Sequence, residues 1–177
     1  MRASLCILVI MGLSGCAATG KKLSEFSTPV VDIGIVVSDV EKAATFYKEA
    51  LGFTEVPGFD VPAAMGADSG LTDGKPFHVR VLKLEDAANA TSVKLMQFPD
   101  ANPARQNNNF IHSTLGFRYL TIYVKDTTAA VERAKKAGAT VLAKGPYLLP
   151  EGFPRGVYLT CVRDPDGNMI ELVGPKR

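Results

Sequence analysis

The chain has 177 residues and a mass of 18.9 kDa, enough for one globular domain or for two small modules that share a core. Hydrophobic residues make up 46% of it, which excludes a disordered tail and allows a full-sized core. Twenty Lys and Arg against 18 Asp and Glu give a formal charge of +2, so we expect neither a nucleic-acid partner nor a polybasic membrane patch. No apolar run approaches the roughly 20 residues that a membrane-spanning helix needs.

The N-terminus has the pattern of a secretory signal. Arg2 precedes an unbroken apolar run over residues 5–11, which is too short to span a bilayer. The tetrapeptide Leu-Ser-Gly-Cys then ends at Cys16 and resembles the bacterial lipobox. This resemblance implies that residues 1–15 are removed as a lipoprotein signal peptide and that Cys16 is lipidated, which anchors the protein to a membrane.

Residues 16–28 are small and polar, as a tether between a membrane and a domain should be. Ala17 rather than Asp follows the cysteine, so the resemblance implies an outer-membrane location facing the periplasm if the cell has two membranes. An ordinary secretory signal, with Cys16 incidental, is the alternative, and replacing Cys16 by Ser would distinguish the two by solubility. The mature chain would keep Cys161 alone, which lies in an apolar run and is expected in the core rather than as a nucleophile.

One structural unit occurs twice in the chain. Residues 32–39 superpose on residues 119–126, and apolar side chains alternate in both segments, which is typical of half-buried strands. An apolar stripe at helical spacing follows each segment, over residues 41–51 and 127–137. Three strand candidates follow each helix, at residues 53–56, 78–84 and 92–98 and at residues 140–143, 157–163 and 168–173.

The repeat predicts an α+β fold of two tandem β-α-β-β-β modules. We place the first module at residues 29–98 and the second at residues 115–177, with a flap or linker over residues 99–114. Residues 57–76 show no alternation either and are also expected to form a flap.

Two segments resemble a known superfamily. Residues 34–53, which begin Gly-Ile-Val-Val-Ser-Asp, and the segment Asp-Pro-Asp-Gly-Asn-Met-Ile-Glu-Leu over residues 164–172 look like the vicinal oxygen chelate group. This group includes glyoxalase I, bleomycin-resistance proteins, methylmalonyl-CoA epimerase and extradiol dioxygenases, and the resemblance covers residues 29–175. It implies mixed sheets that curl around a shared cleft and, in many members, a dimer, so a homodimer is one expected assembly.

Metal-dependent members of the group hold a divalent ion with four strand-borne side chains, typically His or Glu. The matching positions in this chain are Asp32, Lys94, Tyr119 and Glu171. A protonated lysine has no lone pair and a neutral phenol is a poor ligand, so we expect no metal cofactor. A divalent metal on Asp32 and Glu171 is the alternative.

The charge of Lys94 is expected to take the place of the ion. Its Nζ atom should lie within salt-bridge distance of Asp32 or Glu171, with Tyr119 donating to a carboxylate. Removing Lys94 would cost about 3–5 kcal/mol if the cluster is fully buried, and less if water reaches it.

Further cleft residues follow from the strand pattern. Thr121 and Tyr123 share a strand face with Tyr119, so these three side chains suit either contacts with a ligand or cross-strand packing. His112, in the linker, could reach the cleft as a general base, although a solvated loop histidine is the simpler interpretation. The weak catalytic candidates are therefore Tyr119, Glu171 and His112.

Three functions are compatible with this pattern, because one fold can host many activities. The first is a membrane-anchored, non-catalytic domain that binds a small, partly apolar molecule in its cleft. The second is a lyase, isomerase or dioxygenase, either metal-free or with a divalent metal. The third is a structural or partner-binding envelope lipoprotein.

Overall fold

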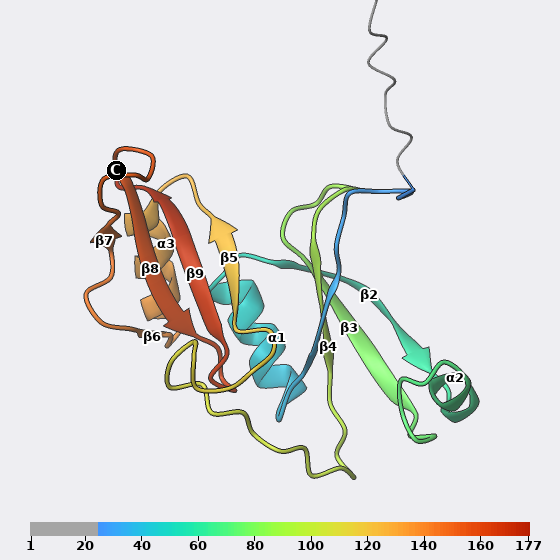
Figure 1. Cartoon of the computed structure of the whole chain (residues 1–177). Coiled ribbons are helices and arrows are strands. Elements are labelled where there is room, and N and C mark those ends of the chain that lie inside the picture. The colour runs from blue at the N-terminus through green and yellow to red at the C-terminus, as the bar shows by residue number, and fades with distance from the viewer. Residues whose placement is uncertain (1–24) are drawn as a thin grey trace, which may run out of the picture.

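The computed structural model describes residues 25–177 (Figure 1). The expected signal peptide and Cys16 lie outside these residues, so the predicted lipid anchor stays a prediction. Within residues 25–177, no helix has the length and apolar character needed to cross a membrane.

The first module follows the predicted order of elements. Its sheet has the strand order β1-β4-β3-β2, in which β1 and β4 run parallel and the other pairs antiparallel. The strands are β1 (Ile33–Val36), β2 (Thr54–Val61), β3 (Phe77–Lys83) and β4 (Ser92–Met96), and α1 (Val40–Glu49) connects β1 to β2. Asp39 caps α1, because its carboxylate accepts a hydrogen bond from the Lys42 backbone N–H at 3.0 Å.

The second module repeats this plan. Its strands have the order β5-β9-β8-β6, and the short strand β7 also pairs with β8. The elements are β5 (Tyr119–Tyr123), α3 (Thr127–Lys136), β6 (Thr140–Val141), β7 (Tyr147–Leu148), β8 (Val157–Arg163) and β9 (Met169–Pro175). Asp126 caps α3 as Asp39 caps α1. The predicted α+β fold of two β-α-β-β-β modules is confirmed.

The prediction of a flap over residues 57–76 is wrong for its first half. β2 continues to Val61, and the short helix α2 (Ala63–Asp68) follows it. A β-bulge between Val56 and Phe59 shifts the register of β2 against β3. The bulge inserts one extra residue, so the period of two breaks there although the strand continues.

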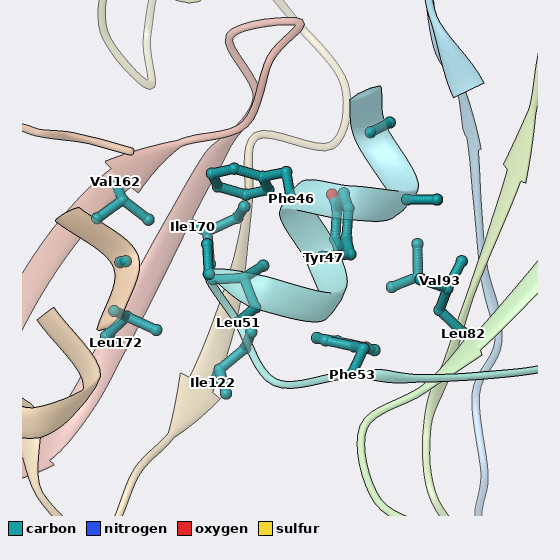
Figure 2. Packing of buried hydrophobic residues seen from close by; sticks show 14 of the residues in the cluster. Phe46, Tyr47, Leu51, Phe53, Leu82, Val93, Ile122, Val162, Ile170 and Leu172 are labelled. Atoms are coloured by element: carbon teal, nitrogen blue, oxygen red, sulfur yellow. The ribbon is translucent and has the colours of Figure 1, made fainter. Parts of the chain in front are cut away.

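The helix α1 lies between the two sheets (Figure 1). Figure 2 shows its side chains pointing in both directions: Tyr47 lies toward Val93 of the first sheet, whereas Phe46 and Leu51 lie toward Ile170 of the second. All of these side chains belong to one buried cluster that includes residues of both modules. The helix-covered faces of the sheets therefore share one core. We call the opposite face of each sheet its open face.

Polar contacts with the Asp-Pro-Asp-Gly-Asn turn join the modules. The buried Tyr47 hydroxyl donates to Asp164 Oδ2 at 3.3 Å, and the Ser38 backbone N–H donates to Asp166 Oδ2 at 3.0 Å. Burial raises the pKa of the Tyr47 hydroxyl, and the charge of Asp164 adds to the effect, so the hydroxyl stays protonated and donates. These contacts hold the end of β1 and the middle of α1 against the second module.

Candidate functional site

A cleft of about 1030 Å³ runs along the free edge of β1. Its walls are residues 31–38, the start of β5, the turn at residues 166–169 and the linker around residues 97–106. Both β1 and β5 are the last strands of their sheets on this side. The lining mixes apolar with polar side chains, and pockets of this size commonly hold small organic ligands.

The linker forms one wall of the cleft and is held by arginines. The Arg118 guanidinium donates to Gln106 Oε1 at 2.9 Å and to Asn108 Oδ1 at 3.0 Å, and all three residues line the cleft. Arg105 connects the linker to the second module through an ion pair with Asp166, at 3.3 Å. Sequence reasoning missed Arg105, Gln106, Asn108 and Arg118, because the linker and the residues between it and β5 show no periodicity and indicated only a flap.

The predicted salt bridge of Lys94 is confirmed for one partner. Lys94 Nζ lies 2.8 Å from Asp32 Oδ2, and Asp32 is part of the cleft wall. The hydrogen bond from Lys94 lowers the pKa of the Asp32 carboxyl, and hydrogen bonds from Ser92 lower it further. The two side chains are 33% and 38% exposed, so water reaches the pair. We therefore expect the loss of Lys94 to cost about 1 kcal/mol or less, not the larger cost of breaking a buried pair.

Glu171 lies elsewhere, on the open face of the second sheet. It sits opposite Thr121 in the pairing of β9 with β5, and the Thr121 hydroxyl donates to its carboxylate at 2.7 Å. Within the described part of the chain, Glu171 makes no ion pair with Lys94. The predicted cluster is therefore split into an Asp32–Lys94 pair and a Thr121–Glu171 pair on different sheets.

The other predicted site residues are not gathered at one place. Tyr119 lines the cleft, whereas Tyr123 lies at the far end of β5 and is highly exposed. His112 stacks on Phe110 in the linker, with 5.6 Å between ring centroids, and does not line the cleft.

Cys161 is half-buried on β8, directly opposite Glu171, rather than in the core as expected. Burial raises the pKa of its thiol, and the charge of Glu171 adds to this effect. A raised pKa keeps the sulfur protonated, which opposes a role as a nucleophile.

The four positions that match metal-dependent relatives do not fit a divalent ion. Asp32 is bound to the ammonium of Lys94, and Glu171 lies on the other sheet with Thr121. Among residues 25–177, no three His, Cys, Asp or Glu side chains come together as metal ligands.

Comparisons with known proteins agree with the architecture. A family model described as the Glyoxalase/Bleomycin resistance protein/Dioxygenase superfamily matches residues 30–172. A glyoxalase family protein from Bacillus cereus superposes with a TM-score of 0.69 at 19% identity, covering 88% of this chain and 99% of its own. A glyoxalase I variant from Zea mays gives a TM-score of 0.60 at 18% identity, covering 82% of this chain and 44% of its own.

A glyoxalase/bleomycin resistance protein/dioxygenase domain from Frankia gives a TM-score of 0.54 at 21% identity, covering 88% of this chain and 94% of its own. No curated protein matches the sequence. At these sequence identities the similarity to solved structures supports the fold but does not indicate an activity.

Proposed function

The chain belongs to the Glyoxalase/Bleomycin resistance protein/Dioxygenase superfamily, and we propose that it is a non-catalytic member that binds a small, partly apolar molecule. The cleft along β1 is the observation that carries this proposal. Its volume suits a small organic ligand, and its lining offers apolar contacts from Val36 and Phe117 beside the polar Gln106 and Asp32.

The chemistry of the side chains supports binding over metal catalysis. An ammonium occupies the position where metal-dependent relatives carry a ligand, and it neutralises the Asp32 carboxylate. The weak catalytic candidates Tyr119, Glu171 and His112 make no mutual contact among the described residues that would form an acid–base pair.

The proposal includes a membrane anchor, in which lipid attached to Cys16 holds the protein at a membrane. This part of the proposal rests on the sequence pattern alone, because the lipobox-like segment lies outside residues 25–177. A domain tethered in this way would capture its ligand close to the membrane surface.

Fluorescence titration tests the binding proposal. The probe is N-phenyl-1-naphthylamine (NPN), a neutral aromatic compound that fluoresces strongly in apolar surroundings. We expect saturable binding by the wild type. Val36 lines the cleft and Leu71 lies outside it, and both side chains are exposed. Val36→Phe should therefore weaken binding about tenfold, or about 1.4 kcal/mol, because the larger ring takes up space in the cleft, whereas Leu71→Phe should leave it unchanged.

Three results would contradict the proposal. NPN binding that ignores Val36→Phe would show that the cleft is not the site. Stoichiometric, tight binding of Ni²⁺, Zn²⁺, Mn²⁺ or Fe²⁺ by the purified protein would favour the catalytic alternative. A wild type that binds no NPN would favour a structural or partner-binding role.

A further inference from the structure

The open face of the first sheet differs in charge from the module that carries it. Residues 29–98 contain ten acidic and six basic side chains. By strand alternation and register, the open face instead carries Lys83 and Lys94 with the single carboxylate of Asp32. The floor around these charges is apolar and includes Val36, Val79, Val81 and Met96. This face therefore favours an anionic group on an otherwise apolar molecule.

The β-bulge in β2 places an aromatic ring beside Lys94. Gly58 lies in the bulge, so close to the strand β3 that a Cβ atom would collide with the Val79 carbonyl oxygen. The bulge brings Phe59 to the open face, where the centre of its ring is 6.0 Å from Lys94 Nζ. The Phe59 side chain is 45% exposed, so a large part of the ring remains accessible to a ligand.

Lys94 has donors to spare for such a ligand. An ammonium has three N–H donors, and the bond to Asp32 uses one of them. Asp32 is also held by Ser92, so it need not move when Lys94 binds a second acceptor. Asp32 is part of the cleft wall, so the ammonium paired with it lies beside the cleft, and the Phe59 ring lies next to that ammonium.

We infer that Phe59 and Lys94 form a subsite for the aromatic, anionic end of the ligand. A planar ring packs on Phe59, and a carboxylate or sulfonate attached to it accepts hydrogen bonds from Lys94. The subsite rests on the proposed function, because the cleft beside Asp32 holds the remainder of the molecule. This subsite narrows the class of expected ligands from partly apolar molecules to aromatic acids.

Two matched probes test the subsite. 1-Anilinonaphthalene-8-sulfonate (ANS) carries the same two aromatic groups as NPN and adds a sulfonate. The wild type should bind ANS about fivefold more tightly than NPN, a preference of about 1 kcal/mol for the added charge. Lys94→Met should weaken ANS binding about tenfold and leave NPN binding within about twofold. Lys94→Arg should keep the preference for ANS.

Replacing Asp32 should change the affinity for ANS in the opposite direction to replacing Lys94. Asp32→Asn removes the anion that competes for Lys94, so ANS should bind more tightly than to the wild type. Phe59→Leu should weaken both probes, because it removes the ring. Phe153, in the second module, is somewhat more exposed than Phe59, at 56%, and Phe153→Leu should change neither affinity. A cooperative thermal transition well above the assay temperature would show that each of these variants is folded.

The outcomes separate the two proposals. If Lys94→Met binds ANS as the wild type does, or if Asp32→Asn weakens it, the subsite is wrong. NPN binding that is lost in Val36→Phe would still support the cleft in that case. If the wild type binds neither probe, both proposals fail.

Discussion

Glu55 is held between two cations on the helix-covered side of the first sheet. Arg80 Nε donates to its carboxylate at 2.6 Å, and Lys48 Nζ donates at 2.8 Å. These hydrogen bonds lower the pKa of Glu55 to about 2, the one from Arg80 most. The folded-state pKa therefore lies below that of an unfolded glutamate, so the ionised form of this residue stabilises the fold.

Replacement of this carboxylate should have a pH-dependent cost. The stabilisation is complete above the unfolded pKa of about 4.5 and is lost as the pH falls toward 2. We expect Glu55→Gln to lower the free energy of unfolding by about 1–2 kcal/mol at neutral pH, allowing for partial solvent exposure. Urea unfolding at about pH 7 and about pH 3.5 checks this, because the difference from the wild type should shrink in acid. A difference that does not depend on pH would contradict the assignment.

At the scale of elements, the bulge in β2 decides which side chains reach the open face. Its glycine packs against the backbone of β3, so we expect Gly58→Ala to lower the free energy of unfolding by about 2 kcal/mol or more. Gly34→Ala is the matched control, because its new Cβ would meet only the mobile methyl end of Met96 at 3.2 Å. Thermal unfolding of both variants measures the difference, and equal melting temperatures would show that the bulge tolerates a side chain.

At the scale of the whole molecule, the two modules carry opposite charge. Residues 29–98 have ten acidic and six basic side chains, and residues 115–177 have six acidic and ten basic ones. We propose that two copies associate with the first module of each beside the second module of the other, because this arrangement pairs opposite charges.

Such a dimer should depend on salt. Attraction between oppositely charged modules is screened beyond about 10 Å at an ionic strength of about 0.1 M. Sedimentation equilibrium should therefore give a dimer that is several-fold tighter at about 0.02 M than at about 0.5 M salt. A monomeric mass at both salt concentrations would exclude this assembly.

Part of the candidate site could be predicted from the family resemblance together with strand alternation. The resemblance singled out Asp32 and Lys94, alternation placed both side chains on the face turned away from the helix, and the ion pair between them is present. Alternation could not predict that Glu171 lies away from Lys94, because it assigns side chains to faces within one sheet and does not tell how two sheets are oriented. The roles of Phe59 and Arg118 were also out of reach, since a bulge and an irregular linker leave no periodic signal.

The sequence by itself determined the repeated module, because local spacing specifies its strands and helices. Only the tertiary structure decided that α1 lies between the sheets, that the linker walls a cleft beside β1, and that the predicted charge cluster is divided in two. These features depend on contacts between residues far apart in the chain. Their energies come from burying the apolar faces of both modules in one core, which no local pattern records.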